Sequence, residues 1–276
     1  MEETIVIGGD ATVRRMGFGA GRLVGPNFYG APKDPKAATR VLHRALELCI
    51  NLIDTADAYG PEINERQIAE ALSPYPAGLM LASKGGYTRE GRSWVENGRP
   101  DYLRKACEAS LRRLKLDVIP LYQLHSPDPG VPLEESVGAL EALRGEGKIR
   151  HIGLSNVDVD ELERARAVAP IASVQNEYNI GARQSDDVVD ACEALGIAFL
   201  AYFPVDAGAL AEAGGAVAKV AKAHGVTQAQ IALAWLLHRS PAICPIPGTS
   251  SVEHLEENVA AARIALSERD LAELGG

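Results

Sequence analysis

Short apolar segments alternate with longer segments of helical periodicity along most of this sequence. The apolar segments have the length of buried strands. They are Met16–Gly19, Asn51–Asp54, Leu79–Lys84, Val118–His125, Ile149–Leu154, Ser173–Gln175, Ala198–Tyr202 and Ile243–Ile246. Because helices between successive strands indicate parallel pairing, the pattern predicts a parallel sheet of eight strand–helix units.

The intervening segments place apolar side chains three and four residues apart, as amphipathic helices do. The predicted helices are Pro35–Leu48, Asp101–Leu114, Leu133–Arg144, Asp158–Val168, Ser185–Leu195, Ala216–His224, Thr227–Arg239 and Val252–Ala262. Thr227 and Gln230 have the spacing of a capping box, which marks the start of one of these helices.

The first residues break this alternation. Thr4–Ile7 and Thr12–Arg15 flank Gly8-Gly9-Asp10, a pattern that predicts a β-hairpin. The remaining eight units can form either a closed barrel or a doubly wound open sheet. A dinucleotide-binding open sheet usually carries Gly-x-Gly-x-x-Gly after its first strand, but Gly17–Arg22 lacks the final glycine. We therefore expect a (β/α)8 TIM barrel with an N-terminal hairpin, and residues 1–276 as one domain.

Composition and charge narrow the function. The net charge of −9 disfavours nucleic acid as a partner, and no apolar run reaches the ~18 residues of a membrane span. The acidic N-terminus does not resemble a signal peptide, so we expect a cytoplasmic protein. The four cysteines have no metal-site spacing, and we expect buried thiols and no metal.

Four polar residues follow apolar strands at positions where a barrel places its active site. They are Asp54, Tyr59, Lys84 and His125. An ammonium lowers the pKa of a nearby tyrosine, a carboxylate holds the ammonium, and a neutral histidine can orient a substrate oxygen. Singly, Asp54, Lys84 and His125 also have ordinary explanations as a helix cap, a snorkelling cation and a structural histidine. Together they indicate a proton-delivery unit.

The motifs that contain these residues resemble those of the aldo-keto reductase family. They are Asp54-Thr55-Ala56-Asp57-Ala58-Tyr59-Gly60 with Asn64-Glu65, Lys84, Tyr122-Gln123-Leu124-His125, Gly153-Leu154-Ser155-Asn156, Gln175-Asn176 and Tyr202. They occur in the family's order, from about Met16 to Asn258. The resemblance implies a carbonyl reductase in which Tyr59 is the general acid, Lys84 and Asp54 lower its pKa, and His125 orients the carbonyl.

The resemblance also implies a nicotinamide cofactor, NADPH with NADH as the alternative. Ser155, Asn156 and Gln175 would hold the carboxamide, and Tyr202 would stack on the nicotinamide ring. The remaining expected cofactor residues are Pro204, Gly208, Gly248, Thr249, Ser250, His254, Glu257 and Asn258.

Three features depart from the family pattern. Cys49 stands where a glycine usually ends the first barrel helix, so we expect a left-handed backbone there. Asp206 lies in the expected pyrophosphate region, and we expect it to face solvent. The segment from Thr249 to His254 lacks the arginine or lysine that relatives place near the 2′-phosphate.

The chain continues for about ten residues past the last barrel helix, whereas many relatives carry a longer C-terminal loop, so we expect an open substrate site. Its walls would come from Leu23–Ala31, with Phe28 and Tyr29, and from Gly85–Arg99, with Tyr87 and Trp94. These segments resemble the bacterial pyridoxal reductase branch, which implies an aromatic aldehyde such as pyridoxal. A natural-product ketone and a sugar aldehyde are the alternatives.

Two other functions fit the same barrel. A lyase could use Lys84 to form a Schiff base with its substrate. A regulatory subunit could bind the cofactor with little turnover, as the potassium-channel β subunits of this fold suggest. For the reductase we expect a small-molecule carbonyl substrate and a monomer or weak oligomer.

Overall fold

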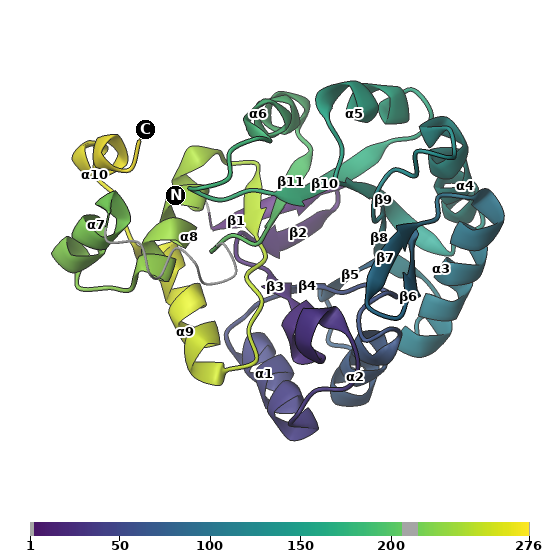
Figure 1. Cartoon of the computed structure of the whole chain (residues 1–276), viewed down its shortest axis with the longest axis horizontal. Coiled ribbons are helices and arrows are strands. Elements are labelled where there is room, and N and C mark those ends of the chain that lie inside the picture. Colours follow the sequence, from purple (N-terminus) through teal and green to yellow (C-terminus); the bar gives the residue numbers. More distant parts are fainter. Residues whose placement is uncertain (1–2, 206–214, 276) are drawn as a thin grey trace.

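Eight parallel strands form a barrel around which the helices are arranged in chain order (Figure 1). The computed structural model describes residues 3–205 and 215–275. Within them the strand order is β12-β11-β10-β9-β8-β5-β4-β3. The strands are β3 (Phe18–Gly19), β4 (Leu52–Asp54), β5 (Met80–Gly85), β8 (Ile119–Leu124), β9 (Ile149–Ser155), β10 (Ile171–Glu177), β11 (Ala198–Tyr202) and β12 (Ile243–Pro245). The predicted (β/α)8 barrel is confirmed.

The helices match the predicted segments closely. They are α1 (Pro35–Glu47), α2 (Ile63–Leu72), α3 (Pro100–Leu114), α4 (Leu133–Gly145), α5 (Val159–Arg166), α6 (Asp186–Leu195), α7 (Ala216–His224), α8 (Gln228–Arg239), α9 (Val252–Ala260) and α10 (Glu268–Glu273). The capping box of Thr227 and Gln230 is present at the start of α8. Helices α2 and α10 were not predicted. Helix α2 buries Asn64 and Glu65, so its inner face does not appear apolar in the sequence.

Two glycines allow the barrel to close between β3 and the segment after β12. The Gly17 N–H donates to the Pro245 carbonyl at 3.0 Å, and the Gly19 N–H donates to the Pro247 carbonyl at 3.3 Å. A Cβ atom on Gly19 would lie only 2.6 Å from the Ile246 carbonyl oxygen. Gly19 therefore permits close backbone approach within the barrel, and Gly17 leaves room for the Ile246 and Leu52 side chains, rather than forming the turn of an open dinucleotide-binding sheet.

The N-terminal hairpin packs against the barrel interior. Its strands are β1 (Thr4–Ile7) and β2 (Ala11–Arg14), which pair antiparallel as predicted. Ile7 and Val13 are buried in one cluster with barrel residues that include Leu52, Leu121 and Leu200. Burial of these side chains removes apolar surface from water at one end of the barrel, which stabilises the closed sheet.

The chemistry-bearing residues have mixed burial. Cys107, Cys192 and Cys244 are free and buried, but Cys49 is exposed, so the expectation of four buried thiols is wrong at that position. Cys49 follows α1 in the left-handed region, where its side chain leaves the apolar face of the helix. Among the described residues, no cluster of three or more His, Cys, Asp or Glu side chains could hold a metal ion. No helix in the described ranges is long and apolar enough to cross a membrane.

Candidate active site

A cleft with a volume of about 1030 Å³ lies at the carboxyl ends of the barrel strands. Asp54 ends β4, Ser155 ends β9 and Tyr202 ends β11, and all three line this cleft. Tyr59 and His125 line it from the loops after β4 and β8. A parallel barrel presents all its carboxyl strand ends on one face, which is why residues distant in sequence meet here.

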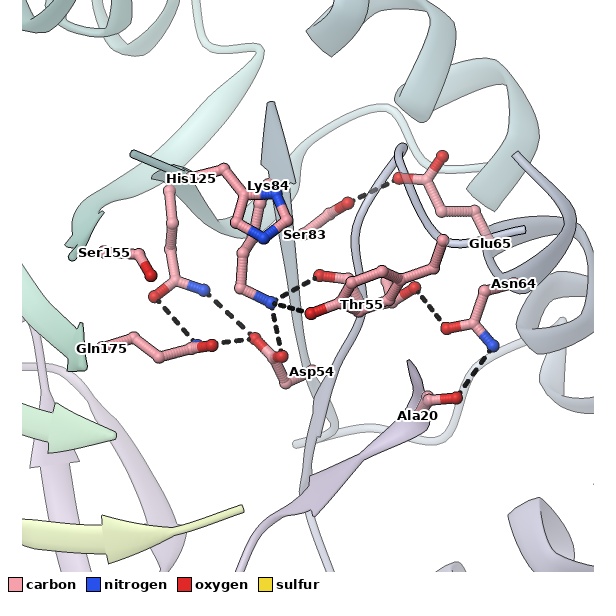
Figure 2. A network of polar contacts seen from close by, with 12 residues as sticks. Ala20, Asp54, Thr55, Asn64, Glu65, Ser83, Lys84, His125, Ser155 and Gln175 are labelled. Carbon is pink, nitrogen blue, oxygen red and sulfur yellow. Dashed lines mark hydrogen bonds and ion pairs between the residues drawn. The ribbon is translucent and has the colours of Figure 1, made fainter. Parts of the chain in front are cut away.

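Lys84 joins two of the predicted catalytic residues below the cleft surface. It lies in β5 and is completely buried. Its Nζ atom is 2.5 Å from Asp54 Oδ1 and 3.3 Å from the Tyr59 hydroxyl oxygen, and it also donates to the Thr55 carbonyl at 3.0 Å. Figure 2 shows Lys84 and Asp54 facing each other across the ends of their strands. The predicted Asp–Tyr–Lys group is therefore assembled in the structure.

Two glutamine side chains fix the second oxygen of Asp54. Gln123 Nε2 donates to Asp54 Oδ2 at 3.1 Å, and Gln175 Nε2 donates to the same atom at 2.9 Å. The sequence motif contained Gln123 but gave it no role. Gln175, which was expected to hold the nicotinamide carboxamide, lines the cleft, and its amide nitrogen donates to Asp54.

The protonation states follow from burial and charge. Burial alone would lower the pKa of Lys84, but the charges and hydrogen bonds of Asp54 and Tyr59 together outweigh this effect, and the net pKa is raised. Burial raises the pKa of Tyr59 by more than the Lys84 ammonium lowers it. The net direction for Tyr59 is thus opposite to the sequence expectation, because the charge argument left out desolvation of the phenolate. At neutral pH the site holds a neutral phenol beside an ammonium ion.

His125 is the neutral base of the group. It is 7% exposed, and its ring meets the Tyr59 ring edge-on with centroids 5.9 Å apart. Burial lowers the pKa of His125 well below its usual range, with further lowering from the Lys84 and Arg89 cations. Its Nδ1 atom has no hydrogen-bond partner among the described residues. A neutral imidazole carries one N–H donor and one acceptor nitrogen, so the His125 ring, which lines the cleft, can hydrogen-bond a ligand oxygen.

Helix α2 supplies a polar layer behind these residues. Asn64 accepts a hydrogen bond from Thr55 Oγ1 at 2.7 Å and donates to the Ala20 carbonyl at 3.0 Å. Glu65 is completely buried, accepts from Ser83 Oγ at 2.5 Å and pairs with Arg113 of α3 at 2.5 Å. Glu65 is therefore a buried support of the site. It joins α2 and α3 to β5, which carries Lys84.

Asn156 and Tyr202, two of the expected nicotinamide-binding residues, form a connected row with the His125 backbone. The Tyr202 hydroxyl donates to Asn156 Oδ1 at 2.7 Å, and Asn156 Nδ2 donates to the His125 carbonyl at 3.0 Å. Asn156 has a positive φ of 59°, a conformation that asparagine tolerates better than most residues. The row therefore connects the ends of β8, β9 and β11.

Most other expected cofactor residues also line the cleft. These are Ser155, Pro204, Gly248, Thr249, His254, Glu257 and Asn258. Ser250 lines a smaller neighbouring cavity of about 490 Å³. Gly208 and Asp206 lie outside the described residues. The cleft therefore extends from the catalytic group to the first turns of α9.

Aromatic side chains form one wall beside Tyr59. Phe28 stacks on Tyr59 with centroids 5.3 Å apart, and Trp94 meets the edges of Tyr59 and His125 at 6.3 and 5.7 Å. Tyr87 packs on His125 at 4.9 Å. Of the four expected substrate residues, Phe28, Tyr87 and Trp94 line the cleft and Tyr29 does not.

An unpredicted hairpin carries part of this wall. Its strands are β6 (Tyr87–Glu90) and β7 (Ser93–Glu96). Arg89 donates from Nη1 to the carbonyls of Phe28 at 3.3 Å and Ala58 at 3.2 Å. Its guanidinium also lies 3.8 Å from the centroid of the Trp94 ring. Arg89 therefore ties the hairpin to the loops that carry Phe28 and Tyr59.

The fold and the site together define a barrel enzyme with a phenol, an ammonium ion and an imidazole at one cleft. Residues 15–275 match the model of the Aldo/keto reductase family. The chain is 43% identical over 276 residues to pyridoxine 4-dehydrogenase of Escherichia coli, which covers 97% of this chain and 96% of that protein. It is 47% identical over 267 residues to an uncharacterized oxidoreductase of Schizosaccharomyces pombe, with 96% of this chain and 87% of that protein covered.

A solved structure agrees with these sequence relatives. An aldo-keto reductase from Klebsiella pneumoniae in complex with NADPH has a TM-score of 0.83 and 29% identity, over 99% of this chain and 94% of that one. The chain belongs to the aldo/keto reductase family. The predicted NAD(P)H-dependent oxidoreductase is confirmed at this level.

Proposed function

We propose that this protein reduces an aldehyde or ketone to the alcohol with NADPH, and that Tyr59 donates the proton. The observation that carries the proposal is the Tyr59 hydroxyl, which lies 3.3 Å from the buried Lys84 ammonium and lines the same cleft as Asn156, Tyr202 and Asn258. Bound NADPH would supply the hydride. The aldo-keto reductase from Klebsiella pneumoniae was solved in complex with NADPH, which supports this choice of cofactor.

The residues of the cleft fit a dinucleotide. Its volume of about 1030 Å³ is at the upper end for ligand pockets. Gly19 and Gly248 leave the floor without side chains, since a Cβ on Gly248 would lie 2.8 Å from the Gly19 carbonyl oxygen. Asn156 and Tyr202 would hold the nicotinamide end, and Thr249, Glu257 and Asn258 the adenosine end.

The protein's part in the reaction is proton delivery. The neutral Tyr59 hydroxyl gives its proton to the substrate oxygen as negative charge develops there. Lys84 stabilises the phenolate that remains, and Asp54 keeps Lys84 charged and fixed in place. Neutral His125 hydrogen-bonds the substrate oxygen and aligns it with Tyr59. Gln123 and Gln175 hold Asp54 in the orientation that this arrangement requires.

An aromatic aldehyde such as pyridoxal is the proposed substrate class. Phe28, Tyr87 and Trp94 give the cleft a flat apolar wall beside the proton donor, and such walls favour ring substrates through offset or edge contacts. The name of the Escherichia coli relative, pyridoxine 4-dehydrogenase, supports the same class. Sugar aldehydes lack the apolar surface that this wall would bury.

The Schiff-base alternative fits the geometry less well. An amine must be neutral and accessible to attack a carbonyl carbon. Lys84 is completely buried, pairs with Asp54 at 2.5 Å and has a raised pKa. The regulatory-subunit alternative is tested by turnover. A single domain over residues 1–276, a cytoplasmic location and a monomeric or weakly associated state stay predictions.

The test compares the wild type with Tyr59→Phe. We expect the wild type to oxidise NADPH with pyridoxal and 4-nitrobenzaldehyde. Tyr59→Phe should lower turnover by at least ~10²-fold, the usual scale of general acid catalysis, and leave NADPH affinity unchanged. Near-normal turnover in Tyr59→Phe would remove Tyr59 from this role. Tight NADPH binding without turnover on any carbonyl would favour the regulatory subunit.

A further inference from the structure

The chain leaves β11 through a residue with a strained backbone. Phe203 follows Tyr202, the last residue of β11, and has a φ of 46°, in the left-handed region. It also precedes Pro204, and the residue before a proline normally has an extended backbone. Strain of this kind persists only where the surrounding structure holds it, and it gathers at functional sites. Other contacts must therefore fix the turn at Phe203.

The turn at Phe203 brings two consecutive rings to the same cleft. Successive side chains of an extended strand point in opposite directions. Tyr202 and Phe203 instead both line the cleft, and their rings meet edge-to-face with centroids 5.2 Å apart. The hydroxyl of Tyr202 is fixed by its bond to Asn156. Phe203 thus supplies a second contact that orients the Tyr202 ring.

One buried side chain holds the Phe203 backbone. Asn179 is completely buried and donates from Nδ2 to the Phe203 carbonyl at 3.0 Å. Strands β10 and β11 pair up to Glu177 and Tyr202, and the Tyr178 N–H donates to the Tyr202 carbonyl at 3.3 Å. The Asn179 amide therefore continues this ladder by one further residue, with a side chain in place of the backbone.

A tight turn after β10 orients the Asn179 amide. The backbone N–H and carbonyl of Asn179 both pair with Ala182, each at 3.1 Å, so they do not pair with the segment after β11. Asn179 Oδ1 accepts from the N–H groups of Gly181 and Ala182 at 2.8 and 2.9 Å. These two bonds fix the oxygen on the side of the turn, and Nδ2 is left facing the Phe203 carbonyl.

We propose that Asn179 is a positioning residue for the nicotinamide end of the cofactor. It holds Phe203 in the left-handed turn, and Phe203 packs on the Tyr202 ring, which contacts the nicotinamide. The assignment rests on the proposed function, in that it requires Tyr202 to face this part of the cofactor. Because Asn179 is buried, it acts only through Phe203 and makes no contact of its own with the ligand.

Calorimetric titrations with NADPH and with adenosine 2′,5′-bisphosphate separate this role from general support of the fold. The second ligand has the adenosine end of NADPH and lacks the nicotinamide. Asn179→Asp keeps both bonds that Oδ1 accepts but, above neutral pH, loses the donor. It should weaken NADPH binding by about 3- to 10-fold, the scale of one hydrogen bond. Its affinity for adenosine 2′,5′-bisphosphate should equal that of the wild type.

Phe203→Leu tests the same route without changing Asn179. It keeps the backbone carbonyl that Asn179 binds and removes the aromatic contact with Tyr202, so it should show the same selective loss of NADPH affinity. The double variant with Asn179→Asp should lose little more than either single variant, because both substitutions break one chain of contacts.

Asn51→Asp is the matched control. Asn51 also donates from Nδ2 to a carbonyl, that of Thr12 at 3.0 Å, and accepts from the Arg14 N–H at 2.8 Å. It precedes β4, however, at the opposite end of the barrel strands. Asn51→Asp should therefore bind NADPH as the wild type does.

Two results would overturn the assignment and leave the proposed function intact. One is an equal loss of affinity for both ligands in Asn179→Asp, which would make Asn179 a general support. The other is an unchanged NADPH affinity in Asn179→Asp or, where that variant does not fold, in Phe203→Leu. A wild type that does not bind NADPH would overturn both the assignment and the proposed function.

Discussion

The residue after α1 provides a direct test of backbone strain. Cys49 has a φ of 62°, in the left-handed region. Its N–H donates to the Leu46 carbonyl at 2.9 Å, and the Ile50 N–H donates to the Ala45 carbonyl at 3.0 Å. These two bonds form a Schellman motif, whose left-handed position normally carries glycine. The sequence expectation for Cys49 is therefore confirmed, and Cys49→Gly should stabilise the protein.

The size of the effect follows from two opposing quantities. A non-glycine residue in the left-handed region costs about 1–2 kcal/mol. Part of this relief, about 0.5–1 kcal/mol, is offset with glycine, because the unfolded chain has more conformational freedom at a glycine. Because Cys49 is exposed, its side chain contributes little packing. The net gain is about 0.5–1 kcal/mol, which corresponds to a rise in melting temperature of about 1–3 °C for a domain of this size.

Thermal unfolding followed by circular dichroism measures this shift. Cys49→Ala is the first control, because it removes the thiol and keeps the strained backbone, and it should not raise the melting temperature. Gly196→Ala is the reverse experiment. Gly196 ends α6 with a φ of 67°, and nothing lies within 4 Å of an added Cβ, so only the backbone penalty should appear as a loss. A rise in Cys49→Ala equal to that in Cys49→Gly would refute the argument from strain.

Two further predictions concern the substrate wall and pH. Arg89→Met should raise KM for an aromatic aldehyde by roughly 10-fold and leave NADPH affinity unchanged. The reason is that Arg89 holds the backbone of Phe28 and packs on the Trp94 ring. The control is Arg92→Met on the same hairpin. A larger effect on cofactor affinity than on KM would contradict this. Burial lowers the pKa of His125 well below 6.5, and the Lys84 and Arg89 cations lower it further. Below about pH 6.5 the unfolded chain therefore binds a proton at His125 that the folded protein does not bind. The free energy of unfolding should thus fall as pH falls below about 6.5, and it should fall less in His125→Gln. An equal drop in melting temperature with pH in the two proteins would argue against this role of His125.

Local sequence signals predicted those features of the site that depend on strand position. Asp54, Lys84 and His125 each follow an apolar run, and a barrel presents such positions on one face, so their approach could be inferred before any coordinates. The start of α8 and the left-handed Cys49 were predictable for a similar reason, since both depend on residues within one turn of each other.

Other features depend on contacts between distant segments. Helix α2 was missed because Asn64 and Glu65 face the interior, where Thr55, Ser83 and Arg113 satisfy them. The raised pKa of Tyr59 was missed because its burial is set by Phe28 and other packed rings, and burial outweighs the nearby ammonium.

The sequence by itself therefore determined the barrel, the catalytic strand ends and the family, since alternation and short motifs are local properties of the chain. Only the tertiary structure decided which side chains from separate loops face one another. Asn179 reaches Phe203 because β10 and β11 end side by side, and Arg89 reaches Phe28 because a hairpin folds over the cleft. The physical reason is that burial, ion pairing and aromatic contact act between neighbours in space, and barrel closure makes neighbours of residues that are far apart along the chain.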